Sequence, residues 1–561
     1  MTAVVPRATY NTLYGPAKGD FVALGDTGLR IQVERSEILA GEEVLIGAGR
    51  NLRDGLAISP RTSRDSALDM VIVSALVVDP VLGIVKADIG IKEDRIVGIG
   101  QAGNPDTQSG VDMVVDSQTQ VVPGAGLIAT PGAIDTHVHL NNVAQAETFC
   151  RHGYTTVIGA SLGPVFDVGI GASYNYENFL DAIGAFPLNV ALLGRACSTP
   201  SEMEAHLDVG CSGFKIHEDL GAFPAVIDAS LSVSDAHDVQ TIIHTDTINE
   251  SVTLAETLQA IDGRTIHAYH VEGTGGGHAP DILEICGQPN VLPSSTNPTN
   301  PFNQAALREH LDMIMACHLQ HRSLYEDLAF AQSRIRPGTM AAEDVLHEVG
   351  AISMMGSDSN GMGRAAESAR RTWQLAAKMK GSTEGPEQHD NERVLRYLEK
   401  YTLCPAMAHG IADHVGSLAS GRLADVVLWN PRFFGVKPEL VIKSGVISYA
   451  MTGPANGSFL MTEPLTMRPQ WGGTGAAPRR LAKVFTSQVG IDGAKRRQSA
   501  HLPRLLTVSG TRGIRKSDLS RNGATPEVRV DPDSFVVSID GVEALSPPSE
   551  RVPLSRRYLL V

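Results

Sequence analysis

The sequence lacks three features that would place the chain in other classes of protein. It has no run of about 18 apolar residues, so we expect no membrane-spanning helix. Its six cysteines form no C-x-x-C pair, which is unlike a disulfide framework or a cysteine-rich zinc site and favours a reducing cytoplasm. The net charge of −15 argues against nucleic-acid binding, which needs a basic face. The first 20 residues contain no long apolar stretch, so we expect no secretory signal.

The chain does contain many short apolar runs, separated by residues typical of turns. At 561 residues it is long enough for several domains, although a barrel of about 250 residues counts as one. Runs rich in Val and Ile, separated by Gly, Asp and Pro, are typical of strands. On the two flanks these runs lie at 69–80, 86–100, 113–130, 416–431 and 439–453.

Between the flanks, strand-like runs alternate with helical patterns, which is typical of repeated βα units. The strand candidates are 134–140, 155–160, 188–194, 213–217, 240–246, 265–270 and 351–358. We therefore predict an α/β fold: a (β/α)8 TIM-like barrel with a composite β domain built from both flanks. The predicted barrel spans 131–415 and 484–561, and the β domain spans 1–130 and 416–483. Within 460–530 we expect surface loops and a helix.

The segment IDTHVHL, residues 134–140, is the first sign of a metal site. His137 and His139 are two residues apart on a predicted strand, so their side chains face the same way. At the C-terminal mouth of a barrel, both imidazoles could bind one metal ion. The H-x-H pattern alone is weak, but the apolar strand before it, ending in polar residues, is what a barrel mouth requires.

Lys215 in GFKIHED is unusual because it lies inside a predicted strand between Phe214 and Ile216, whereas lysine is normally exposed to solvent. One interpretation is a salt-bridged lysine or one whose amine reaches water. The other is a lysine that CO2 carbamylates, which turns a buried cation into an anionic ligand bridging two metals. Burial favours this reaction because it lowers the lysine pKa and leaves more free amine. His217 shares the same strand face.

Three further candidates follow apolar runs. They are His244, His270 and Asp358, each near the C-terminal end of a predicted strand. His267 competes with His270, but its odd spacing points it to the opposite face. An aspartate can bind a metal and also accept a proton from water. Each of these residues alone could be a core residue with satisfied hydrogen bonds. Together, at the loop-facing ends of five strands, they indicate a two-metal catalytic site with nitrogen and oxygen ligands.

These motifs resemble the urease catalytic (alpha) subunit, a member of the amidohydrolase superfamily. The resemblance rests on HVH, K-x-H-E-D, HTDT-x-NES, H-x-EG-x-GGGHAPD and SDS, and also on YGPAKGD, VLPSSTNPT and FGVKPELVIK. It covers most of residues 10–460 and thins towards the C-terminus.

The resemblance implies hydrolysis of urea to ammonia and carbamate, and then CO2, at two nickel ions bridged by Lys215 as N6-carboxylysine. His244 and His270 would complete the coordination of one ion, and His137, His139 and Asp358 would bind the other. The residues themselves support a two-metal site, whereas nickel comes from the resemblance.

The resemblance also implies roles for residues outside the metal site. His217 would bind the urea oxygen. His318 would act as general acid on a helical flap near 309–336, with Cys317 beside it and with Asp219 and Arg334 tuning or positioning the acid. Periodicity alone would make Cys317 and His318 a surface pair. The implied partners are urease beta and gamma subunits and nickel-insertion accessory proteins, in a trimer of heterotrimers without nucleic acid or membrane, in the cytoplasm.

The sequence departs from the family pattern beside the expected site. Residues 141–160 lack a Cys-Pro-Gln-containing stretch, and 161–179 replace a Thr-, Asn- and Cys-rich loop. Asn360 and Gly361 stand where Gln-Ala is usual. Changes around metal ligands typically cost 10–100-fold in metal affinity or activity. Two alternatives therefore stay open: an amidohydrolase acting on another small amide or urea derivative, and a weakly active or non-catalytic urease paralogue.

Overall fold

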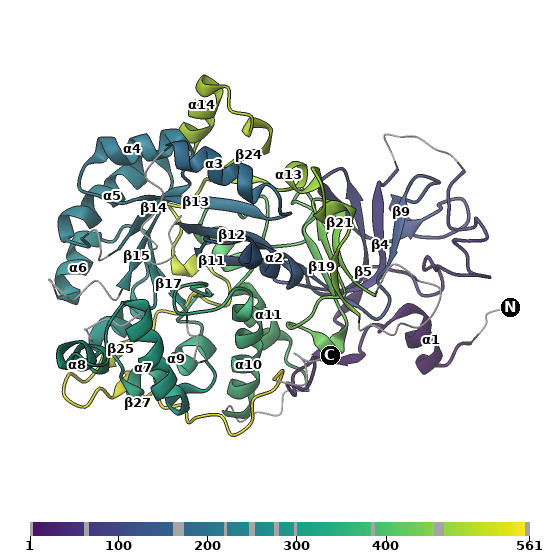
Figure 1. Cartoon of the computed structure of the whole chain (residues 1–561). Coiled ribbons are helices and arrows are strands. Elements are labelled where there is room, and N and C mark those ends of the chain that lie inside the picture. Colours follow the sequence, from purple (N-terminus) through teal and green to yellow (C-terminus); the bar gives the residue numbers. More distant parts are fainter. Residues whose placement is uncertain are drawn as a thin grey trace.

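A computed structural model of the chain shows a barrel of parallel strands beside a β-rich region (Figure 1). The structure describes residues 4–60, 67–160, 173–217, 221–245, 253–273, 280–296, 300–382, 388–453 and 465–555. Within these ranges no helix is long and apolar enough to cross a membrane.

Eight consecutive strands run parallel and form the barrel wall, in the order β11 to β18. An isolated parallel bridge between Val138 and Ser359 joins the segment after β18 back to β11, so the wall is nearly closed. The strands are buried on both faces, as expected for a parallel barrel covered by helices. Their bounds are β11 Ala133–His139, β12 Tyr154–Ala160, β13 Asn189–Arg195, β14 Gly213–Ile216, β15 Gln240–His244, β16 Ile266–Tyr269, β17 Val291–Ser295 and β18 Met354–Met355. The predicted (β/α)8 fold is confirmed.

Helices follow these strands and surround the barrel (Figure 1). Ile, Leu and Val side chains from the strands and the helices share one continuous core. The helices of the barrel region are α2 Val143–Arg151, α3 Ser173–Ile183, α4 Pro200–Val209, α5 Pro224–His237, α6 Leu254–Ile261, α7 Leu307–Cys317, α8 Tyr325–Ser333, α9 Pro337–Glu348, α10 Glu367–Ser382, α11 Asn391–Glu399 and α12 Leu403–Ala408. Helices α7 and α8 pack against each other in the region predicted to form a flap.

A second large sheet contains strands from both flanks of the barrel. Strand β10 pairs antiparallel with β19, which joins the segment before the barrel to the segment after it. The bounds are β3 Arg35–Ser36, β4 Met70–Asp79, β5 Gly83–Lys92, β6 Arg95–Gly100, β9 Gln120–Pro123, β10 Ile128–Pro131, β19 Val426–Trp429, β20 Leu440–Lys443, β21 Val446–Thr452 and β22 Thr466–Pro469. The division of the chain into domains at residues 130, 415 and 483 stays a prediction.

The C-terminal part of the chain differs from the expected loops and single helix. Strand β23 (Val484–Thr486) pairs in parallel with barrel strand β13, and β24 (Leu505–Thr507) pairs with β23. Helices α13 (Ala477–Leu481) and α14 (Gln488–Arg497) flank these strands. Three-residue strands are too short for periodicity to reveal, which is why the sequence pattern missed them.

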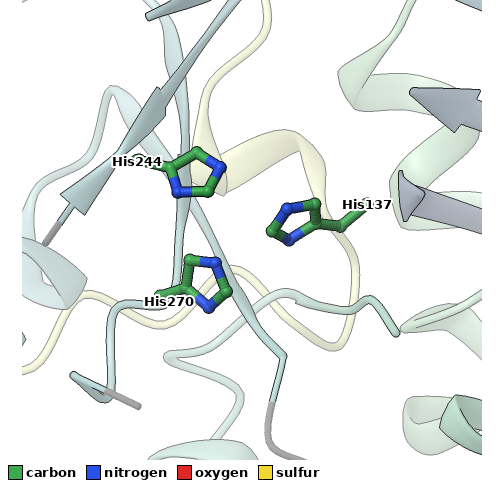
Figure 2. A group of neighbouring side chains, drawn as sticks. All are labelled: His137, His244 and His270. Carbon is green, nitrogen blue, oxygen red and sulfur yellow. The ribbon is translucent and has the colours of Figure 1, made fainter. Parts of the chain in front are cut away.

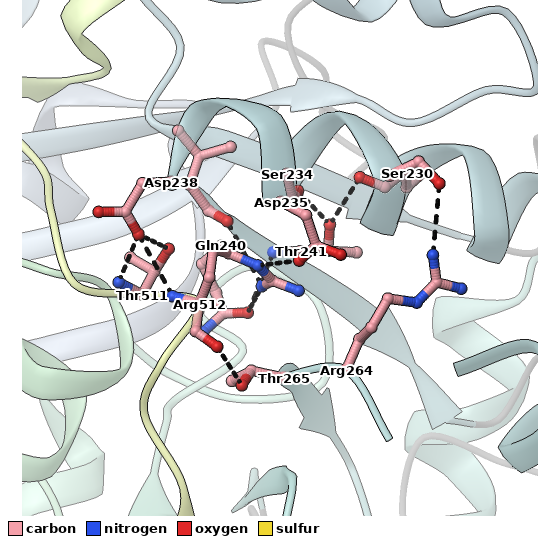
Figure 3. A network of polar contacts seen from close by, with 12 residues as sticks. Ser230, Ser234, Asp235, Asp238, Gln240, Thr241, Arg264, Thr265, Thr511 and Arg512 are labelled. Atoms are coloured by element: carbon pink, nitrogen blue, oxygen red, sulfur yellow. Dashed lines mark hydrogen bonds and ion pairs between the residues drawn. The ribbon is translucent and has the colours of Figure 1, made fainter. Parts of the chain in front are cut away.

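The Asp238 carboxylate at the end of α5 binds the backbone of the segment after β24. Asp238 accepts hydrogen bonds from the backbone N–H groups of Thr511 and Arg512 at 2.8 and 3.3 Å (Figure 3). It also accepts one from the backbone N–H group of Gly510 at 2.6 Å. Burial alone would raise the pKa of Asp238, but these bonds and the Thr511 hydroxyl lower it below its usual value. The bonded aspartate is therefore ionised at neutral pH.

We expect Asp238→Ala to lower the free energy of unfolding by about 1–2 kcal/mol, because several backbone donors lose a charged acceptor. Because the folded-state pKa is depressed, this stabilisation is present above the usual aspartate pKa and is lost as the pH falls through the lowered value. Guanidinium unfolding midpoints at pH 7 measure the effect. Asp235→Ala is the control, since its exposed bond to Arg512 at 2.7 Å is worth at most about 1 kcal/mol. Equal losses in both variants would contradict the assignment to Asp238.

Candidate metal centre

Imidazole and carboxylate groups from several barrel strands converge at the C-terminal mouth of the barrel. His137 and His139 lie on β11, His244 ends β15, and His270 directly follows β16. Asp358 follows β18 and lies between the two histidines of β11, with its Oδ1 atom 3.4 Å from His137 Nε2 and 3.0 Å from His139 Nε2. All five side chains are buried.

The donor atoms fall into two groups that share one histidine. The first group is His137, His244 and His270, and the second is His137, His139 and Asp358. Within each group the possible ligand atoms all lie within 4.8 Å of one another. Figure 2 shows the three imidazoles of the first group facing a common point. This spacing suits one metal ion per group, with His137 between the two.

The electrostatics of these groups also suit a metal. Burial lowers the pKa of His137 and His244 well below the usual histidine value, so both imidazoles are neutral and able to donate an electron pair. Burial alone would raise the pKa of Asp358, but His137 and His139 together lower it well below its usual value. The centre therefore offers two neutral imidazoles, those of His137 and His244, and an ionised carboxylate, and its nitrogen and oxygen donors fit a divalent transition metal.

Backbone geometry at two of these residues is unusual. His270 has φ +53 and Asp358 has φ +49, in the left-handed region that residues other than glycine rarely adopt. Such conformations cost of order 1–3 kcal/mol each and persist only where the surrounding structure fixes them. These conformations, just after β16 for His270 and three residues after β18 for Asp358, turn both side chains into the centre.

Lys215 and His217 lie beside the centre. Lys215 is on β14, is fully buried, and its Nζ atom lies 4.5 Å from the ring centroid of Tyr269. Its charge is one of the causes that lower the pKa of His137 and His244, after burial. The ring of His217 lies 4.5 Å from that of His244. The structure thus brings together all seven residues that the sequence predicts for metal and substrate binding.

Of the three residues predicted to assist proton transfer, two lie at the ends of helices α7 and α8. His318 is the C-cap of α7, half-buried, with its Nδ1 atom 3.0 Å from the Ile314 carbonyl oxygen. Arg334 is the C-cap of α8, buried, with its guanidinium carbon 3.8 Å from the Phe330 ring centroid. Asp219 lies outside the described residues. The flap roles of these residues stay predictions.

Two residues that the sequence analysis did not single out support the ligands. The Asp135 carboxylate accepts hydrogen bonds from the backbone N–H groups of His137 and Ser357, both at 3.1 Å, and so ties β11 to the segment carrying Asp358. The hydroxyl of Thr296 lies 3.3 Å from His137 Nδ1, which leaves Nε2 to face the centre. For Asp135 the signal was available, since it shares the strand face of His137 and His139.

The residues that depart from the family pattern after Asp358 also border the centre. The Asn360 amide donates to the His139 carbonyl at 3.3 Å and to the Asn141 side-chain oxygen at 2.7 Å. A Cβ atom at Gly361 would lie 2.4 Å from Asp358 Oδ1 and 3.0 Å from His139 Nε2. The backbone thus approaches the ligands closely at position 361. The departures at 161–172 lie outside the described residues.

Comparison with known proteins matches the chain to two family models. Residues 128–460 match the family model "Amidohydrolase family", and residues 3–122 match "Urease alpha-subunit, N-terminal domain". Among curated proteins, "Urease subunit alpha" of Sulfurisphaera tokodaii is 48% identical over 99% of this chain and 100% of its own. "Urease subunit alpha 1" of Streptomyces avermitilis is 47% identical over 98% of this chain and 99% of its own.

Among solved structures, that of a D-hydantoinase covers 75% of this chain and 99% of its own, at 12% identity and a TM-score of 0.50. This likeness concerns the fold alone. The buried histidine cluster and the matched families together indicate a metal-dependent hydrolase site.

Proposed function

The chain belongs to the urease alpha-subunit family, and on that premise we propose that it hydrolyses urea to ammonia and carbamate at a dinuclear nickel centre. The carbamate would then release CO2. The observation that carries this proposal is the pair of donor groups sharing His137 at the mouth of the barrel. Two groups of buried donors less than 5 Å across suit two ions in one site, and two such ions can together polarise a carbonyl and activate water.

The residues present fit two divalent ions. His244 and His270 would hold one ion, and His139 and Asp358 the other, with His137 assigned to the second ion although it reaches both groups. Lys215, as N6-carboxylysine formed with CO2, would add an anionic ligand between them. The bound ions would supply Lewis acidity, which polarises the substrate carbonyl and makes water a better nucleophile at neutral pH.

The protein side chains would orient the substrate and handle its protons. His217, beside His244, would donate a hydrogen bond to the urea oxygen. His318, at the end of α7, would act as general acid and give a proton to the departing ammonia when the flap closes. Asp219 and Arg334 would tune or position this acid. Closure would exclude water and so strengthen these polar contacts.

The proposal extends to the assembly in which the chain works. Membership of the urease alpha-subunit family implies urea as substrate and other urease subunits as partners. We propose beta and gamma subunits in a trimer of heterotrimers, with nickel inserted by accessory proteins in the cytoplasm.

A second candidate is a related enzyme acting on another small amide or urea derivative. The residues that favour it are Asn360 and Gly361, which border the ligands and differ from the family pattern. Kinetics on urea and on N-substituted ureas separate the two candidates. A higher kcat/KM for a substituted urea would favour the second.

The first test is to co-express the chain with its partner subunits and nickel-loading proteins, and to measure metal content and ammonia release together. We expect about two nickel ions per chain and turnover of urea. Two ions without urea turnover would favour the second candidate. A chain without metal would contradict both and leave a non-catalytic paralogue.

A further inference from the structure

Tyr269, the last residue of β16, lies against the metal centre without contributing a ligand. Its buried ring stacks on the His137 imidazole, with centroids 4.0 Å apart and an angle of 22° between the planes. Lys215 Nζ lies 4.5 Å from the same ring centroid, and the His244 ring meets it edge-on at 5.6 Å. One aromatic ring therefore contacts predicted ligands from three different strands.

The ring of Tyr269 is itself held in place from two directions. Its hydroxyl donates a hydrogen bond to the backbone carbonyl of Thr136, the residue before His137. On another side the His267 ring packs edge-on against it at 4.7 Å. His267 is fixed in turn by polar contacts to His409 at 3.0 Å and Ser294 at 2.9 Å. The ring thus has little freedom to turn or slide.

We propose that Tyr269 is a positioning residue for the metal centre, one that fixes the plane of His137 and the side-chain path of Lys215. The inference rests on the proposed metal centre. Metal–ligand bonds are directional, and a site works only when its ligands are held within about 0.5 Å of their productive positions. The hydroxyl fixes the ring relative to the backbone of β11, and the ring then limits how His137 can tilt. In many metal sites a hydrogen-bonding partner fixes the orientation of the histidine ligand, and here the Tyr269 ring would do the same for His137 by stacking.

A core aromatic residue without this role would affect stability but not metal affinity, and two substitutions separate these cases. Tyr269→Leu removes the ring, and Tyr269→Phe keeps the ring but removes the hydroxyl. The matched control is Tyr401→Phe, because Tyr401 is also buried and its hydroxyl also takes part in a hydrogen bond. That bond is donated by the Trp373 indole at 3.0 Å, and Trp373 is not a predicted metal ligand.

The experiment uses the assembled complex loaded with nickel, and measures nickel retained per chain against a graded concentration of chelator. We expect Tyr269→Leu to weaken nickel binding about 10–100-fold, the range found when supporting residues of metal ligands are lost. Tyr269→Phe should weaken it about fivefold, the factor corresponding to one net hydrogen bond. The Tyr401→Phe control should bind nickel as the wild type does. For the Tyr269 variants, kcat should fall while KM changes little.

Wild-type nickel affinity in both Tyr269 variants, or an equal loss in Tyr401→Phe, would overturn the inference. If Tyr269→Leu fails to assemble, Tyr269→Phe decides alone, because it preserves the volume of the side chain. A wild-type complex that holds no nickel would contradict the proposed metal centre itself. A wild-type complex with two ions and unaffected Tyr269 variants would contradict only the positioning role.

Discussion

Lys215→Ala is expected to lose both bound nickel ions and urea turnover. Lys215 is fully buried on β14 beside the histidine cluster, and as a carbamate it would be an anionic ligand shared by the two ions. Without it, each ion loses an anionic ligand. Lewis-acid stabilisation by metals is worth several kcal/mol, and each 1.36 kcal/mol is a factor of ten in rate, so we expect kcat to fall about 1000-fold or more.

Metal content and ammonia release, measured on the same co-expressed complex, test this prediction. The control is Lys516→Met, which also replaces a buried lysine. Lys516 donates to the carbonyl oxygens of Cys286 and Ala351 at 2.6 and 2.7 Å, so its loss should reduce stability but leave nickel in place. A Lys215→Ala complex that retains about two nickel ions would refute the bridging role, whatever its activity.

The barrel could be predicted from the sequence because its strands are buried on both faces. Such strands appear as short continuous apolar runs, and seven of the eight were visible in this way. Strand β17, Val291–Ser295, was missed because it contains Pro293 and ends in two serines, a composition that argues against a central strand. In the structure Pro293 aligns with Ala268 of β16.

The candidate site could be predicted because its ligands stand where strands end. Alternation along a strand places His137 and His139 on one face, and apolar runs before His244 and Asp358 placed those residues at the mouth of the barrel. The sequence could not show how the two donor groups overlap, because that depends on the distance between β11 and β16, more than a hundred residues apart. The left-handed conformations of His270 and Asp358, and the position of Tyr269 under His137, depend on the same tertiary packing.

His137→Ala is expected to remove nickel from both positions, whereas His139→Ala should leave about one ion per chain. The structure gives the reason, since His137 belongs to both donor groups and His139 to only one. The resemblance to the family assigns both histidines to the same ion, and on that assignment alone the two variants should behave alike. Nickel content per chain, measured after exhaustive dialysis of the assembled complex, distinguishes the two expectations.

His501→Ala serves as the control for loss of a buried histidine, because His501 lies against Asp181 at 3.3 Å and outside both donor groups. It should retain about two nickel ions. Equal nickel content in the His137 and His139 variants would mean that loss of His137 affects one ion only, although its ring lies close to His244 and His270. A lower content in the His137 variant would show that its loss also disturbs the donor group of His244 and His270. The Tyr269 ring stacked on His137 would then influence both donor groups.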